Sequence, residues 1–325
     1  MKQGNLPGLM GVLVCLLGSV NLAMAGSLGP ITGWGLDAFG EVSNIPSGTF
    51  TAITGGWENA YALRADGTIT AWGRDVNGQV SNIPTGTFVA IAAGLGNAYA
   101  LRTDGTIAAW GDDAYGEISN VPAGNFMAIA AGYYSDCYAI RTDGTIAAWG
   151  LDPFGEVSNV PSGTFKAIAG GMATAYALRT DGTIAAWGWD GNGQVSNVPS
   201  GTFTALAAGG TTAYALRSDG TIAAWGWDEY GQVSNVPSGT FTAISAGVHN
   251  GYALRPDGTI AAWGWDEYGQ VSNVPSGTFT TVTGALGSGY AISDTGATVP
   301  EPFTLLGVTM SLAGIGGYLR KRAKA

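Results

Sequence analysis

Short apolar runs separated by turn residues recur along most of the chain. Residues 203–226 read FTALAAGGTTAYALRSDGTIAAWG and contain three such runs, at 203–209, 213–217 and 221–226. Between the last two runs stands Asp219-Gly220, a pair that favours tight hairpins because its residues tolerate positive φ. Apolar runs this short, bounded by turn residues, are typical of strands. The pattern therefore predicts small antiparallel sheets.

The same pattern occurs seven times along the chain. Its Trp-Gly pair begins at Trp34, Trp72, Trp110, Trp149, Trp187, Trp225 and Trp263, with a spacing of 38 residues except for one of 39 before Trp149. The third run is apolar on both alternating faces, so each sheet should be covered on both sides. A ring of sheets, the β-propeller, provides this cover. A parallel β-helix is the rival, but its coils are usually shorter and lack a hairpin in each.

The two ends of the array complete each other. Residues 29–35 match only the third run of a unit, and residues 289–297 match only the second run and its turn. Together they make one blade and would hide both sheet edges. We therefore expect an all-β, seven-bladed propeller over residues 26–298, closed by its N- and C-terminal strands.

Both termini resemble export signals. Residues 1–25 have a basic start, an apolar stretch and an Ala23-Met24-Ala25 end, as a cleaved signal peptide has. Residues 299–325 resemble the PEP-CTERM sorting signal. They hold the motif Val299-Pro300-Glu301-Pro302, an uncharged segment at 303–319 that would span roughly 25 Å as a transmembrane helix, and a basic tail.

That resemblance implies an exosortase as processing partner and a bacterium with an outer membrane as the source. It implies export to the cell envelope, the cell surface or the extracellular matrix, with membrane contact only through the C-terminal helix before processing. Whether the helix is cleaved or retained stays open.

The repeat itself is similar to that of the regulator of chromosome condensation family. The likeness lies in ALRTDGTIAAWG (177–188) and in the DEYGQ that follows later copies (228–232), and it extends over the body of the chain. The short unit is closer to the compact bacterial version found in a secreted propeller that inhibits β-lactamases. The exchange-factor activity of the nuclear members is not implied, because only scaffold positions are shared.

Sequence variation is concentrated in two loops of each unit, one before the Tyr-Ala run and one after Trp-Gly. An up-down-up path places both loops on one face, here called the loop face. The nearly identical Asp-Gly and Pro-Ser-Gly-Thr-Phe turns lie on the opposite turn face. Aromatic residues crowd the variable loops: Phe39, Trp57, Tyr115, Tyr133, Tyr134, Phe154, Trp189, Trp227, Tyr230, Trp265 and Tyr268.

Clustered exposed rings suit a protein or polysaccharide ligand, since they bury much area at little entropic cost. The alternative is that part of them only pack over the blade ends. Asp228 and Asp266 lie between rings of their loops and would accept hydrogen bonds from such a ligand. They belong to a set of one Asp per unit: Asp37, Asp75, Asp113, Asp152, Asp190, Asp228 and Asp266. One interpretation of this set is a ring that attracts cations or basic partners. We favour the structural interpretation, that each Asp accepts backbone N–H bonds within its loop.

Charge and composition exclude several functions. Residues 26–298 hold eight basic and 22 acidic side chains, so no basic stripe exists for nucleic acid. His249 is the only histidine, and Cys137 is the only cysteine beyond the signal peptide. We therefore expect no metal site, no cofactor and no catalytic residues, and a buried Cys137 without a disulfide partner. Arginines before the Asp-Gly turns are expected to pair with neighbouring carboxylates or carbonyls.

Two classes of function remain open. The favoured one is an exported, non-catalytic binding or matrix protein that engages a protein or exopolysaccharide through the loop face. The alternative is a secreted propeller hydrolase that uses acidic residues on that face. Nearly identical units distribute residues symmetrically, whereas catalysis needs specialised ones, and this favours binding.

Overall fold

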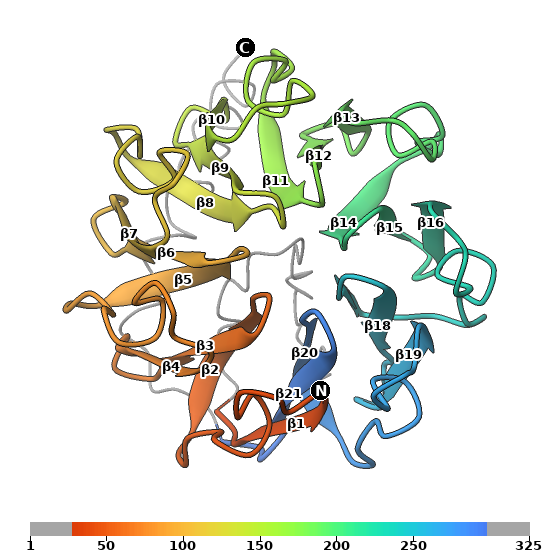
Figure 1. Cartoon of the computed structure of the whole chain (residues 1–325). Helices are drawn as coiled ribbons and strands as arrows, with labels where there is room; N and C mark the ends of the chain where they lie inside the picture. The colour runs from red at the N-terminus through yellow and green to blue at the C-terminus, as the bar shows by residue number, and fades with distance from the viewer. Residues whose placement is uncertain (1–27, 298–325) are drawn as a thin grey trace, which may run out of the picture.

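The computed structural model describes residues 28–297, which form seven three-stranded antiparallel sheets around a central axis (Figure 1). The inner strands are β2 (Phe50–Gly55), β5 (Phe88–Ala93), β8 (Phe126–Ala131), β11 (Phe165–Gly170), β14 (Phe203–Ala208), β17 (Ala243–Ala246) and β20 (Phe279–Gly284). The middle strands are β3 (Asn59–Arg64), β6 (Asn97–Arg102), β9 (Asp136–Arg141), β12 (Thr174–Arg179), β15 (Thr212–Arg217), β18 (Asn250–Leu254) and β21 (Ser288–Ser293). The outer strands are β1 (Ile31–Gly35), β4 (Ile69–Gly73), β7 (Ile107–Gly111), β10 (Ile146–Gly150), β13 (Ile184–Gly188), β16 (Ile222–Gly226) and β19 (Ile260–Gly264).

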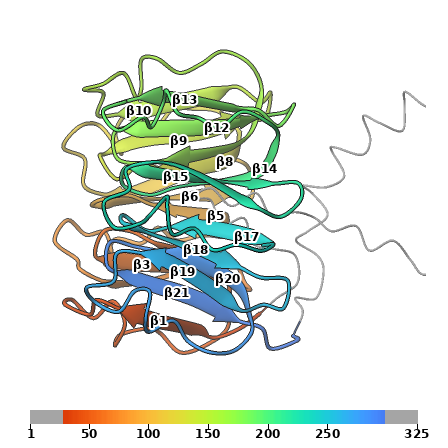
Figure 2. The ribbon, with the colours of Figure 1, turned by 90° about the vertical axis from the view of Figure 1, so that its right-hand side faces the viewer.

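This arrangement confirms the all-β fold and the seven blades. The chain ends meet in one composite sheet, in which β21 pairs with β20 on one side and with β1 on the other. Trp34 of β1 lies opposite Gly289 of β21, and a bridge between Leu28 and Ala297 extends the closure. The molecule seen from the side shows the sheets stacked around the axis (Figure 2).

Small residues allow the inner strands to come close together. A Cβ placed on Gly170 would lie 2.7 Å from the backbone nitrogen of Gly132, and one on Gly284 would lie 2.4 Å from that of Gly247. Both distances are below any real van der Waals contact, so only glycine fits at these inner ends. Alanine fills most of the remaining inner positions, where neighbouring blades converge.

An aromatic pair and a hydrogen bond join each blade to the next. The Tyr61 ring packs edge-on against Trp110 of the next blade at 5.7 Å. The Trp110 indole N–H donates to the carbonyl of Gln79 at 2.8 Å. The seven tryptophans all make this bond, to Gln270, Glu41, Gln79, Glu117, Glu156, Gln194 and Gln232 in chain order. These Gln and Glu side chains are buried, a role that the repeat pattern did not reveal.

The outer strand of each blade is less buried than expected. In the outer strands at most alternate residues are buried: in β16 Ala223 and Trp225 are buried, whereas Ile222 and Ala224 are half-exposed, and in β1, β4 and β13 only the Trp is buried. Blades diverge away from the axis, so the outer strand is covered less completely. The segment that follows it forms turns, such as the bond from Asn235 N–H to the Gly231 carbonyl at 3.1 Å. Each blade therefore has three strands.

The predicted signal peptide (1–25) and sorting segment (299–325) lie outside the described residues. Within residues 28–297, no helix has the length and apolar character needed to cross a membrane. The helix predicted at 303–319 is not among the residues covered by that statement.

Candidate binding site

Backbone hydrogen bonds define the two faces of the ring. The loop after each outer strand opens with an N–H that donates to the loop between the inner and middle strands, as from Trp227 to the Thr211 carbonyl at 3.0 Å. On the opposite side, each Asp-Gly turn accepts a bond from the chain entering the next blade, as from Phe203 N–H to the Gly182 carbonyl at 2.8 Å. The loop face and the turn face thus contain the segments that the sequence predicted for them.

Exposed hydrophobic side chains gather on the loop face. Of the nine large ones in the described residues, only Met127, on β8, belongs to a strand. The other eight lie in the variable loops: Phe39, Val76, Leu95, Tyr115, Tyr134, Phe154, Tyr230 and Tyr268. Trp57, Trp189, Trp227 and Trp265 are half-buried there. The loops of this face therefore expose more large apolar side chains than the turns of the opposite face do.

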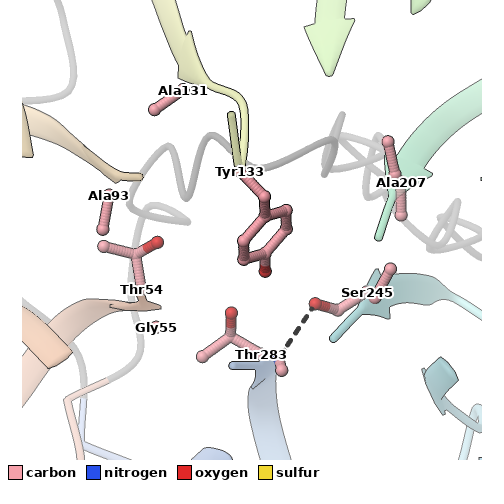
Figure 3. Close-up of a pocket in the computed structure, with 11 residues that line it drawn as sticks. Thr54, Gly55, Ala93, Ala131, Tyr133, Ala207, Ser245 and Thr283 are labelled. Atoms are coloured by element: carbon pink, nitrogen blue, oxygen red, sulfur yellow. Dashed lines mark hydrogen bonds between the residues drawn. The ribbon is translucent and has the colours of Figure 1, made fainter. Parts of the chain in front are cut away.

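Tyr133 departs from the predicted exposure. Its side chain is only 7% exposed, because its loop extends inward and its ring enters the axial channel between the inner strands (Figure 3). The Tyr133 N–H donates to the Gly171 carbonyl of the next blade at 2.9 Å. Burial raises the pKa of Tyr133 to about 12. The space beside the ring, about 20 Å³, has room for one water molecule. Tyr133 therefore occupies part of the channel, and its neighbour Tyr134 is the exposed ring of this loop.

Five rings from two adjacent blades form one aromatic cluster, made of Trp227, Tyr230, His249, Trp265 and Tyr268. His249 lies between the two tryptophans, with centroid distances of 5.3 Å to Trp227 and 5.7 Å to Trp265. Tyr230 lies 6.1 Å from Trp265 and links the blades directly. Each Tyr also packs edge-on against the Trp of its own loop, at 5.3 Å in both loops.

The cluster is not repeated around the ring. Trp189 packs with Phe154 of the preceding blade at 6.5 Å, and Asn192 stands where Tyr230 stands in the next unit. On a further pair of blades the Arg74 guanidinium covers the Phe39 ring at 5.1 Å. The structure brings Trp227, Tyr230, Trp265 and Tyr268 together, whereas Trp57, Tyr134 and Trp189 lie in other loops. It adds His249, which stands out in the sequence only as a lone histidine.

The loop aspartates have the structural role that we favoured. One carboxylate oxygen of Asp228 accepts the N–H groups of Val233 at 2.7 Å and Ser234 at 2.9 Å. Desolvation alone would raise the pKa of Asp228, but these N–H groups outweigh it and hold the pKa below its ordinary value. All seven members of the set make such bonds: Asp37, Asp75, Asp113, Asp152, Asp190, Asp228 and Asp266.

The arginines before the Asp-Gly turns stack on rings. Arg217 lies 5.0 Å above the Phe203 ring, and six arginines repeat this contact, at Arg64, Arg102, Arg141, Arg179, Arg217 and Arg255. Part of the expected carbonyl pairing also occurs, as from Arg102 to the Thr85 carbonyl at 3.2 Å. Stacking on phenylalanine was not foreseen, because the two residues stand on different strands.

Two titratable side chains, Asp136 and Cys137, lie buried beneath the loop face. In residues 28–297 no three His, Cys, Asp or Glu side chains are placed to hold a metal ion. Cys137 is buried and free, as predicted, and its Sγ lies 2.7 Å from the Tyr99 hydroxyl. Asp136 is also buried and accepts the Tyr138 hydroxyl at 2.7 Å. Burial raises the pKa of Asp136 to about 7.

Comparison with known proteins agrees with this architecture. The family described as regulator of chromosome condensation (RCC1) repeat matches residues 88–117 and 203–232. The fold is an RCC1-like propeller. A search of the curated proteins returned no match.

Three solved structures illustrate the likeness. Prp20p from Saccharomyces cerevisiae has a TM-score of 0.71 at 17% identity, over 84% of this chain and 93% of that one. Human WBSCR16 has a TM-score of 0.68 at 14% identity, over 83% and 99%. The ectodomain of the Arabidopsis thaliana receptor kinase ACR4 has a TM-score of 0.62 at 18% identity, over 73% and 90%. At these identities the likeness is one of fold.

Proposed function

We propose that this protein is an exported, non-catalytic binding or matrix protein whose loop face engages an extracellular polysaccharide. The observation that carries the proposal is the location of eight of the nine exposed large hydrophobic side chains in the loops of that face. The aromatic cluster lies on the same face. Sugar rings stack their C–H faces on such side chains, while sugar hydroxyls bond to nearby carboxylates and backbone groups.

A protein partner is the runner-up. Exposed tyrosine and tryptophan also serve protein interfaces, and a solved structure of similar fold is that of Kap60 bound to yeast RCC1 (Prp20), at 16% identity. Aromatic side chains follow one another along neighbouring blades. This favours a polysaccharide over a protein partner, because an extended sugar chain can cross several blades.

The hydrolase alternative has less support. It needs two carboxylates free to act on one substrate. The loop aspartates are instead engaged by backbone N–H groups of their own loops.

The test compares the two faces. Purified protein is passed over immobilised cellulose, alginate and chitosan, which are neutral, acidic and amine-bearing. Alanine at Trp189, Trp227 and Trp265 should weaken retention at least about ten-fold, since each important ring contributes on the order of 1–3 kcal/mol. Alanine at Ser162, Ser200 and Ser238 on the turn face should leave retention unchanged. Retention on none of the three polymers, or its loss in the serine variant alone, would contradict the proposal.

Export is part of the same proposal, with an exosortase as processing partner and the cell surface or matrix as destination. Replacing Glu301 and Pro302, or deleting residues 320–324, should leave the signal peptide working and trap the protein in the inner membrane. Immunoblots of membrane and medium fractions measure this. Normal release of both variants would remove the case for sorting.

A further inference from the structure

The aromatic cluster contains the same loop twice. Residues 225–232 and 263–270 both read WGWDEYGQ, and they occupy equivalent places on adjacent blades. Tyr230 of the first copy contacts Trp265 of the second at 6.1 Å, and His249 lies between their tryptophans. Two copies of one loop sequence on adjacent blades suit a ligand built from repeating units.

The two copies are also strongly acidic. Each contributes an Asp and a Glu, and all four side chains are exposed. The single ion pair among residues 28–297 joins Arg74 to Glu58, on a different blade. Neither copy contains Lys or Arg, and the nearest arginines in sequence, Arg217 and Arg255, stand at Asp-Gly turns on the turn face.

His249 does not offset this charge. Its desolvation among the rings lowers its pKa, so the imidazole is neutral at neutral pH. Desolvation raises the pKa of Asp228 and of Asp266, but the hydrogen bonds they accept together outweigh it and hold both pKa values below the ordinary one, so both carboxyls stay ionised. The cluster therefore presents rings and uncompensated negative charge together.

We propose that the aromatic cluster binds a linear amino-sugar polymer, with one free, protonated amine near each Trp-Asp-Glu-Tyr copy. This inference rests on the proposed function and specifies its ligand class. Each tryptophan offers a face to a sugar ring, and Glu229 or Glu267 pairs with the amine. A cation close to an aromatic ring gains further attraction from its π face.

Charge decides between polysaccharide classes. An acidic polymer would be repelled by the cluster and by a body with 22 acidic and eight basic residues. A neutral polymer would cover the carboxylates without supplying a counter-charge. Binding would then desolvate ionised groups that gain no positive partner, and this costs free energy. A basic peptide would also match the charge, but the repeated loop sequence favours a ligand with a regular repeat of its own.

The experiment uses calorimetry with two probes, the β-1,4-linked hexamer of glucosamine and the same hexamer fully N-acetylated. Acetylation keeps the sugar rings and removes the positive charges. We expect the glucosamine hexamer to bind at least about ten-fold more tightly, and its affinity to fall as salt is raised.

Variants separate the role of charge from that of stacking. Glu229→Gln with Glu267→Gln should bring the affinity for glucosamine hexamer down to that for the acetylated one. Trp227→Ala with Trp265→Ala should weaken both probes. Asp112→Asn, an acid of the equivalent loop across the ring (Figure 1, strand β7), is the matched control and should change neither. Thermal unfolding checks that every variant is folded.

Equal affinity for both hexamers, or no effect of the glutamate pair, would overturn the amino-sugar inference. If the tryptophan pair still weakened both probes, the proposed polysaccharide function would stand. Binding of octalysine but of neither hexamer, lost in the tryptophan pair, would indicate a basic protein partner and overturn the inference. An unchanged affinity for every probe in the tryptophan pair would contradict the inference and the proposed function together.

Discussion

The turn face and the loop face are made by the same seven units but differ in how their side chains are employed. On the turn face, Asp219 accepts both the N–H of Thr221 at 2.9 Å and its hydroxyl at 2.7 Å, and Gly220 has a φ of 85°. Arg217 stacks on Phe203. Five further Asp-Gly turns repeat this glycine geometry.

On the loop face, fewer side chains hold the backbone in place. Its recurring framework is the Asp that accepts N–H groups and the buried Gln or Glu that bonds the backbone two residues before it, as Gln232 does with Tyr230. The position directly before this Asp contains Leu, Arg, Asp or Trp, and the position two residues after it contains Phe, Asn or Tyr. Where side chains are not needed to hold the backbone, they are free to meet a ligand. This division explains why variation and exposed rings coincide.

Both faces depend on closure of the ring by β1. Loss of this closure should have the largest effect on stability of all the changes proposed. Deleting residues 26–35 removes β1, the Trp34 contact with Tyr252 at 5.7 Å and the bond from Trp34 to the Gln270 carbonyl at 2.8 Å. We expect the free energy of unfolding to fall by about 3–5 kcal/mol or more, measured by denaturant titration. Deleting only residues 1–25 is the control. An unchanged midpoint in the longer deletion would contradict a closed ring.

The next prediction concerns the buried acid beneath the loop face. The Asp136 carboxyl has a pKa of about 7, because its ionised form is desolvated. The folded state thus binds a proton that the unfolded state releases near pH 4, and stability should fall as pH rises from about 4 to 7. Asp136→Asn should raise the free energy of unfolding at pH 8 by about 2–4 kcal/mol.

Asn stands at the equivalent position in Asn59, Asn97 and Asn250, so this variant suits the fold. Urea titrations from pH 4 to pH 8 compare it with the wild type. The prediction is contradicted if the stability of the wild type does not fall over this pH range, or if Asp136→Asn shows the same fall. Either result would mean that the Asp136 carboxyl titrates normally. By contrast, hydrogen bonds from Thr183 hold the pKa of the turn-face Asp181 below its ordinary value.

Backbone geometry gives the third prediction. Gly182 on the turn face has a φ of 89°, so Gly182→Ala should cost about 1–2 kcal/mol of stability. Asn192→Ala on the loop face changes an exposed side chain and should stay within about 0.5 kcal/mol. Thermal unfolding of both variants sharpens the contrast between the faces. Equal losses of stability in the two variants would contradict a difference between the faces.

The smallest effect is expected from the arginine stacks. Arg217→Ala removes a cation–π contact at 5.0 Å from Phe203 and should cost about 0.5–1 kcal/mol. Polysaccharide retention should not change, because the contact lies on the turn face. A loss of retention with unchanged stability would assign these arginines to binding instead.

Much of the fold could be predicted because its signals are local and repeated. Asp-Gly pairs, apolar runs and incomplete end units are enough to identify the strands, the ring and its closure. The roles of the loop aspartates and the separation of the two faces were predicted correctly for the same reason. The burial of Tyr133 was not, because one extra residue in its unit does not reveal that the loop turns toward the axis.

The sequence by itself determined the periodicity, the turns, the blade count and the face on which aromatic residues gather, since each depends on neighbours within one unit. Tertiary structure decided the contacts between units. The indole of Trp110 finds the Gln79 carbonyl 31 positions away, and His249 lies between tryptophans of two other loops. Such contacts depend on how adjacent blades converge around the axis, a geometry that no single repeat contains.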